Sequence, residues 1–143
     1  MSEEDRDYIN VTAAIIQEGQ NILIVRRAQN QSHAGKWEFP GGKIDPGETA
    51  EDCLRRELLE ELGIRVQEVQ SFIVFEYDYH RSDRKKHRFF SFWCMILEGI
   101  LSLRVHDSLE WVKIEDLSKF DIIEADRQLV KALLENQKGG EAL

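Results

Sequence analysis

The stretch "GGKIDPGETAEDCLRRELLEELGI", residues 41–64, joins a glycine-rich segment to a run that is crowded with acids. It opens with a glycine pair and turns again at "DPG", which is a typical composition for a loop. Thr49 is a typical cap for the start of a helix, because its hydroxyl can accept a hydrogen bond from a free backbone N–H. Gly63 is a typical residue for the other end. The sequence therefore predicts a glycine-rich loop followed by a helix that ends at about Leu62.

The predicted helix carries acids on one face and leucines on the face beside it. Glu57, Glu60 and Glu61 are spaced i, i+3 and i+4, so they share one side of the helix. Like charges at this spacing destabilise a helix by about a few tenths of a kcal/mol. The acids either form a solvated face, with Arg55 and Arg56 reducing part of their repulsion, or they together bind a cation. The apolar stripe beside them consists of Leu54, Leu58 and Leu62.

Outside this stretch, most of the chain has the β-branched and aromatic composition of strands. The predicted strands are residues 9–17, 21–27, 66–79, 87–101 and 108–114. The glycine- and proline-rich residues 36–48 are predicted to form a loop, and residues 124–137 have leucines at helical spacing. Hairpins without regular βαβ units favour an α+β fold with a mixed sheet. We expect one domain over residues 1–143, with about 1–7 and 138–143 frayed.

Composition restricts the class of protein. The chain has 143 residues, 42% of them hydrophobic, and a formal net charge of −8. This charge argues against a surface that coats nucleic acid. Cys53 and Cys94 lie in apolar stretches and are expected to be buried free thiols. The acidic start lacks a signal-peptide core, and the longest apolar stretch, Phe89 to Leu97, is far shorter than the roughly 20 residues of a membrane span. A cytoplasmic enzyme or binding protein without a membrane partner is expected.

The acidic helix and the loop before it match a known pattern. The pattern is G-x5-E-x7-R-E-U-x-E-E-x-G-U, where U is a bulky aliphatic residue. Every fixed position is filled, by Gly42, Glu48, Arg56, Glu57, Leu58, Glu60, Glu61, Gly63 and Ile64. The chain therefore resembles the Nudix hydrolase family. The flanking segments "KWEFPGGKI" and "EADRQLV" resemble its MutT-type branch. The resemblance implies the Nudix fold, a mixed β-sheet sandwiched between helices.

The resemblance also implies a metal site and catalytic residues. Glu57, Glu60 and Glu61 would ligate Mg²⁺, or Mn²⁺ as a substitute, together with the backbone carbonyl of Gly41. Mg²⁺ prefers oxygen ligands and can activate water near neutral pH. The resemblance assigns catalytic roles to Glu57, Glu60 and Arg56. Glu57 is the expected general base, and Arg56 is expected to form a supporting salt bridge with Glu48.

The implied reaction is hydrolysis of a (deoxy)nucleoside triphosphate to the monophosphate and pyrophosphate. Oxidised guanine nucleotides such as 8-oxo-dGTP are the leading substrates, and cytidine triphosphates, the 5′ end of RNA and ADP-ribose-like molecules are alternatives. A non-catalytic ligand sensor with the same fold is a further alternative, although such a module usually lacks some of the acids. The resemblance implies three substrate contacts, which are Arg27 at the phosphates and Arg88 and Asp126 at the base. Phe39 either lines a base pocket or packs in the core. We expect a small nucleotide as the partner, no stable nucleic-acid partner, and a monomer or homodimer.

Two features leave questions open at the sequence level. MutT-type enzymes commonly place a further Glu a few residues before the Trp that aligns with Trp111, but Val105 stands at that position. Either the neighbouring His106 or Asp107 takes over, or the site relies on the helix acids alone. The basic segment "HRSDRKKHR", residues 80–88, is either a solvated hairpin tip or a site that binds phosphate or RNA.

Overall fold

The computed structural model describes residues 8–79 and 86–141, with side chains as far as residue 137. Most of the basic segment at residues 80–88 therefore lies outside the described residues. In chain order the elements are β1 (Tyr8–Glu18), β2 (Asn21–Arg27), β3 (Trp37–Glu38), α2 (Ala50–Leu62), β4 (Arg65–Tyr77), β5 (Lys86–Glu98), β6 (His106–Lys113), the 3₁₀ helices η1 (Ile114–Lys119) and η2 (Glu124–Asp126), and α3 (Arg127–Glu141).

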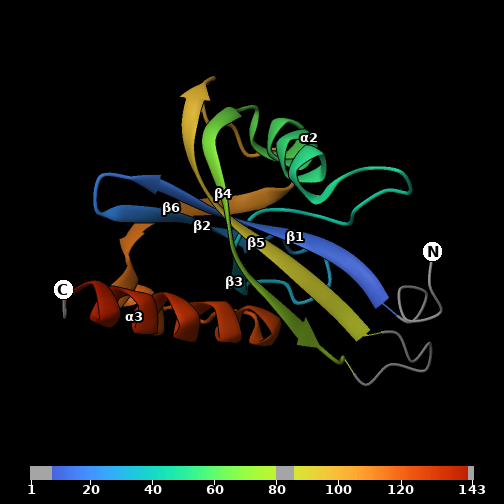
Figure 1. Cartoon of the computed structure of the whole chain (residues 1–143). Helices are drawn as coiled ribbons and strands as arrows, with labels where there is room; N and C mark the ends of the chain where they lie inside the picture. Colours follow the sequence, from blue (N-terminus) through green and yellow to red (C-terminus); the bar gives the residue numbers. More distant parts are fainter. Residues whose placement is uncertain (1–7, 80–85, 142–143) are drawn as a thin grey trace.

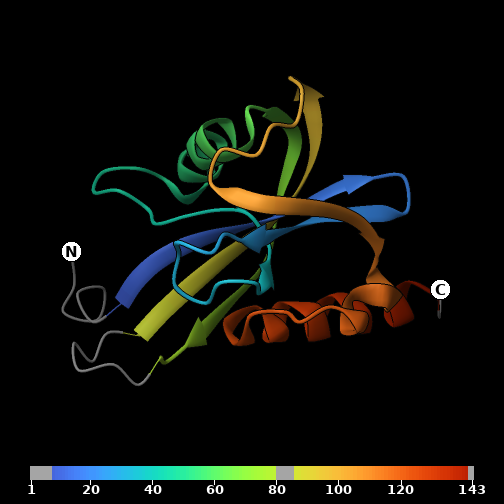
Figure 2. The same ribbon diagram turned by 180° about the vertical axis from the view of Figure 1, so that it is seen from behind.

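A mixed sheet forms the centre of the molecule, with α2 on one face and α3 on the other (Figures 1 and 2). The strand order is β3-β2-β1-β5-β4, and β6 pairs with β2. Strands β1 and β5 run parallel, in register from Tyr8 opposite Lys86 to Ile16 opposite Cys94. The other named pairs are antiparallel. The predicted α+β fold with a mixed sheet between helices is confirmed.

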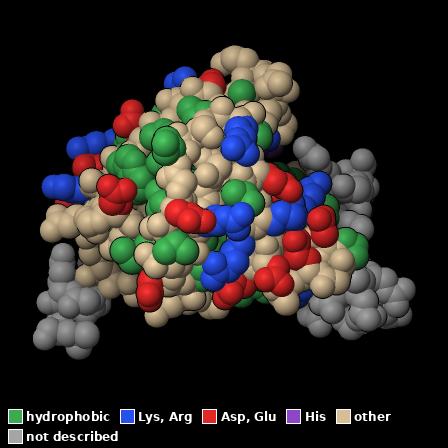
Figure 3. All heavy atoms as spheres, turned by 90° about the horizontal axis from the view of Figure 1, so that it is seen from above, with side chains coloured by type: hydrophobic (Ala, Val, Ile, Leu, Met, Phe, Trp, Pro, Cys, Tyr) green, Lys and Arg blue, Asp and Glu red, His purple; other side chains and the backbone are tan. Residues whose placement is uncertain are grey.

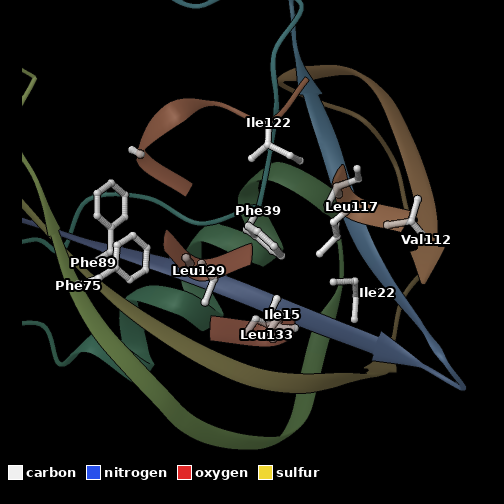
Figure 4. Close-up of a cluster of buried hydrophobic side chains, with 13 residues drawn as sticks. Ile15, Ile22, Phe39, Phe75, Phe89, Val112, Leu117, Ile122, Leu129 and Leu133 are labelled. Atoms are coloured by element: carbon white, nitrogen blue, oxygen red, sulfur yellow. The ribbon is translucent and has the colours of Figure 1, made fainter. Parts of the chain in front are cut away.

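Two apolar clusters hold the helices on the sheet, and β1 contributes to both. Ala14 and Ile16 pack in the cluster under α2, together with Leu54, Leu58 and Leu62 of this helix. Ala13 and Ile15 point to the other face, where they pack with Leu129 and other residues of the α3 cluster (Figure 4). Side chains of a strand alternate between faces, so a strand buried on both sides reads as a continuous apolar run. The run "AAII" therefore places β1 at the centre of the molecule.

Two elements differ from the sequence predictions. The predicted loop at residues 36–48 contains the short strand β3, which pairs with β2 through Arg26 opposite Trp37. The C-terminal helix starts later than expected, at Arg127, because η2 forms the turn before it. It continues to Glu141, into the segment 138–143 that was expected to be frayed. Within the described residues, no helix combines the length and the apolar content that a membrane crossing needs.

Candidate active site

Helix α2 begins and ends where its capping residues predict. The hydroxyl of Thr49 accepts a hydrogen bond from the backbone N–H of Asp52 at 3.1 Å. Gly63 ends the helix in the left-handed conformation, with φ 71°, and its N–H donates to the carbonyl of Leu59. Glycine adopts this conformation without the steric cost that a Cβ adds. The caps fix the helical register, and with it the direction of each acid on α2.

The glycine pair lies between β1 and α2 with no space for a side chain. The backbone N–H of Thr12 donates to the Gly42 carbonyl at 2.8 Å, which fixes the loop on β1. A Cβ on Gly41 would overlap the Thr12 carbonyl, and a Cβ on Gly42 would lie 2.5 Å from both carboxylate oxygens of Glu57. Glycine at both positions therefore lets the loop backbone approach the helix acids closely.

Arg56 ties this loop to the helix and to two of the acids. Its guanidinium donates to both oxygens of Glu48, at 2.7 and 2.9 Å, so the predicted salt bridge is present. These hydrogen bonds lower the pKa of Glu48 to about 2. A further nitrogen of Arg56 donates to Glu57 at 3.0 Å and to Glu60 at 3.2 Å. On this side of the molecule, acidic and basic side chains are interleaved (Figure 3). Arg56 therefore relieves part of the repulsion among the acids.

Glu61 differs from the other two acids in its surroundings. Its Oε2 atom is buried and has no hydrogen-bond partner among the described residues. Burial raises the pKa of Glu61 strongly, and the charges of Glu57 and Glu38 raise it further. By contrast, the side chain of Glu60 is 58% exposed. The three acids share one helix face, but only Glu61 carries a buried oxygen without a partner.

The donor chemistry at this place fits a divalent cation. Within the part of the chain that the structure describes, no three carboxylate, His or Cys side chains already form a metal-binding group. Arg56 holds Glu57 and Glu60, so these acids would have to turn from it to share a cation with Glu61. Such a cation would supply the missing partner of the Glu61 oxygen and would remove the repulsion that raises its pKa. Oxygen donors of this kind suit Mg²⁺.

A cavity of about 350 Å³ lies beside Glu61 and reaches Asp126, directly before α3. Its lining includes Gly41 and Gly42, together with Phe39, Tyr79 and Phe89. Arg27, Glu38 and His106 also line it. The fold therefore brings four of the predicted site residues, Arg27, Phe39, Gly41 and Asp126, to the same cavity as Glu61.

Asp126 lines the cavity and is almost completely buried. Only 5% of the surface of Asp126 is exposed. Its Oδ2 accepts a hydrogen bond from the backbone N–H of Phe39 at 2.9 Å. Burial, followed by the charge of Glu38, raises the pKa of Asp126 to about 8. The side chain is therefore mostly a neutral carboxylic acid at pH 7, which can both donate and accept a hydrogen bond.

Glu38 is a site residue that the sequence analysis missed. Its carboxylate accepts two hydrogen bonds from Arg27, at 3.2 and 3.0 Å, and lies 2.9 Å from Nε2 of His106. The signal that could have found it is its place directly before Phe39, in a segment already expected to line the base pocket. The prediction of a loop hid the pairing of β3 with β2, which directs this carboxylate into the cavity.

Five of the candidate residues do not line the cavity, namely Arg56, Glu57, Glu60, Arg88 and Asp107. Arg88 donates to Asn10 at 2.9 Å, and its guanidinium lies 4.5 Å from the centre of the Tyr8 ring. It is not among the cavity-lining residues. Asp107 accepts a hydrogen bond from Arg26 at 2.7 Å, also away from the cavity. Of the neighbours of Val105, only His106 therefore shares the cavity with it.

Known proteins resemble this chain over most of its length. The model of the NUDIX domain matches residues 8–133. The CTP pyrophosphohydrolase of Escherichia coli (strain K12) is 32% identical over 136 residues, covering 88% of this chain and 91% of that protein. The 8-oxo-dGTP diphosphatase of the same strain is 44% identical over 72 residues, covering 50% of this chain and 56% of that protein. The solution structure of the E. coli ORF135 protein has a TM-score of 0.77 at 29% identity, covering 91% of each chain.

Proposed function

Because the chain belongs to the NUDIX hydrolase family, we propose that it hydrolyses (deoxy)nucleoside triphosphates to the monophosphate and pyrophosphate. The preferred substrates are oxidised guanine nucleotides such as 8-oxo-dGTP. The observation that carries this proposal is the buried carboxyl group of Asp126, which shares a cavity with Glu61 and the glycine pair; its burial raises its pKa and favours the neutral acid. Removal of damaged nucleotides from the cytoplasmic pool would follow from this activity.

The acids and the glycine loop would hold Mg²⁺. Glu57, Glu61 and the Gly41 carbonyl are the proposed ligands nearest the cavity, and Glu60 would join them by turning from Arg56. When bound, Mg²⁺ neutralises charge on phosphate oxygens and makes bound water more acidic. Glu57 is the proposed general base. In the absence of a cation, the carboxylates would repel a triphosphate, so activity should depend on the metal.

A neutral carboxylic acid at Asp126 suits the edge of oxidised guanine. This edge presents an N7–H donor beside the O6 acceptor, whereas guanine presents two acceptors there. A protonated Asp126 offers one acceptor oxygen and one O–H donor, which pair with the donor and acceptor of the oxidised base. With ordinary guanine, the acceptor oxygen of Asp126 would face N7, another acceptor. A buried polar group left without a partner costs about 1–3 kcal/mol, or roughly ten- to hundredfold in kcat/KM.

Cytidine triphosphates are the second candidate substrates. Cytosine presents an amino donor beside the N3 acceptor, and the same protonated Asp126 can pair with both. The similarity to a protein named CTP pyrophosphohydrolase, over 88% of this chain, supports this candidate. Phosphate contact by Arg27 would require it to turn from Glu38 and Ser32, to which it donates. Stacking of Phe39 on the base would require its ring to become accessible, because this residue is 4% exposed and packs in the core cluster. A role for Arg88 would require it to leave its contacts with Asn10 and Tyr8.

A panel of triphosphates tests the proposal. Release of monophosphate and pyrophosphate would be measured with Mg²⁺, and separately with Mn²⁺, on 8-oxo-dGTP, dGTP, CTP, dCTP and an RNA with a 5′-triphosphate. We expect the highest kcat/KM on 8-oxo-dGTP, with products that leave the α-phosphate on the nucleoside. Glu57→Gln is the control for contaminating activity. Preference for CTP would favour the second candidate, and tight binding without turnover would favour a ligand sensor.

A further inference from the structure

Three side chains from neighbouring strands form a connected group on the wall of the cavity. Arg27 on β2 donates twice to Glu38 on β3. Glu38 in turn lies 2.9 Å from Nε2 of His106 on β6. Both outer strands pair with β2, so the backbone fixes the spacing of all three. The group is rigid because each of its side chains is held by a fixed neighbour.

His106 has one ring nitrogen with no partner. Its side chain is 3% exposed, and its Nδ1 is buried without a hydrogen-bond partner among the described residues. An ionised carboxylate only accepts hydrogen bonds, so Nε2 carries the proton that faces Glu38. In the neutral ring of this tautomer, Nδ1 is an acceptor. A buried acceptor without a partner is unfavourable, and the cavity that His106 lines is where a bound ligand could supply a donor.

The position of the group indicates which part of a nucleotide would reach it. The charge of Glu38 acts on both Glu61 and Asp126, and all three residues line the same cavity. Glu38 is therefore close both to the acid proposed to hold the metal at the phosphates and to the residue proposed to read the base. In a nucleotide the sugar lies between the base and the phosphates, and its hydroxyl groups are the hydrogen-bond donors there. A phosphate oxygen is an acceptor and would be repelled by the Glu38 carboxylate.

We propose that Nδ1 of His106 accepts a hydrogen bond from a sugar hydroxyl of the substrate, with Glu38 as the positioning residue that fixes the ring. This inference rests on the proposed function and extends it to the sugar. Arg27 neutralises Glu38 and keeps its carboxylate in place. The same three residues would therefore set how strongly the enzyme depends on the hydroxyls of the sugar.

A series of sugar analogues on one base tests the proposal in the wild-type protein. All analogues would carry the base of the triphosphate that the wild type hydrolyses fastest. The sugars would be ribose, 2′-deoxyribose, 3′-deoxyribose and 2′,3′-dideoxyribose. We expect kcat/KM for the dideoxy compound to be at least about tenfold below that of the best substrate. Thermal protection by the matching monophosphates should show the same order. Equal kcat/KM on all four compounds would overturn the inference, and no turnover of any nucleotide would overturn the proposed function with it.

Variants then assign the effect to the group. His106→Phe keeps a flat ring but has no acceptor, so its kcat/KM should be the same with and without the sugar hydroxyl. Glu38→Gln weakens the hydrogen bond to the His106 ring, so its kcat/KM should depend less on the sugar hydroxyl than that of wild type. This variant replaces His106→Phe in the test if His106→Phe does not fold. Asp107→Asn, next on β6 but outside the cavity, should keep the wild-type ratio. The assignment would be refuted if His106→Phe still preferred nucleotides with the sugar hydroxyl, or if its kcat/KM fell by the same factor on every sugar.

Discussion

Alanine at Gly42 should act through Glu57 and should leave the fold almost unchanged. The added Cβ would lie 2.5 Å from both carboxylate oxygens of Glu57. Ordinary contact between such atoms is about 3.5 Å, so the carboxylate must retreat by about 1 Å. A displacement of about 1 Å at a catalytic group can cost roughly 100-fold in rate. The atoms that must move end a flexible side chain, and Gly42 has no positive φ, so the backbone can remain in place.

Two measurements separate this effect from loss of structure. The value of kcat at saturating Mg²⁺ should fall by about 100-fold in Gly42→Ala, while Tm stays within a few degrees of wild type. Gly41→Ala is the matched contrast, because its Cβ would overlap the backbone carbonyl of Thr12 on the central strand. That variant should lower Tm clearly, since neither backbone can move without disturbing β1.

A double variant tests the mechanism. If Gly42→Ala works by displacing Glu57, then Gly42→Ala/Glu57→Gln should be no slower than Glu57→Gln alone, because the same contribution cannot be lost twice. If the factors by which the two substitutions lower kcat multiply in the double variant, Gly42 acts on a group other than Glu57. Activity of Gly42→Ala within about threefold of wild type would refute the argument as a whole, and with it the close placement of the Glu57 carboxylate for the reaction.

Three further predictions concern Asp126 and the metal. Asp126→Ala should lower kcat/KM for 8-oxo-dGTP by at least about tenfold and change that for dGTP much less, whereas equal losses would remove Asp126 from base reading. The pKa of Asp126 is raised from 3.8 to about 8, so the folded state holds an extra proton between these values and its stability falls as pH rises through that window. The Tm of Asp126→Asn relative to wild type should therefore increase from about pH 5 to pH 9, and a constant difference would contradict a raised pKa. Mg²⁺ should raise Tm by binding the native state, and less so in Glu61→Gln, while an identical rise in that variant would place the ion elsewhere.

The sequence predicted where α2 begins and ends, and which loop precedes it, because the interactions that fix them are local. Thr49 and Gly63 act on backbone groups within one turn of themselves, and helical spacing alone puts Glu57 and Glu61 on one face. The apolar runs likewise predicted every strand except β3, which is two residues long and too short to have a periodic pattern. The metal-binding and catalytic roles of these acids stay predictions.

The acidic helix, the glycine loop and the strand at residues 9–17 follow from neighbours along the chain, so the sequence was enough to predict them. The contact between Glu38 and His106 could not be predicted in this way, because it depends on two strands pairing with β2 from distant parts of the chain. The raised pKa of Asp126 likewise depends on the tertiary structure, because folding removes water from around its carboxyl group. Strand register and desolvation arise from the packed whole, and no local pattern encodes them.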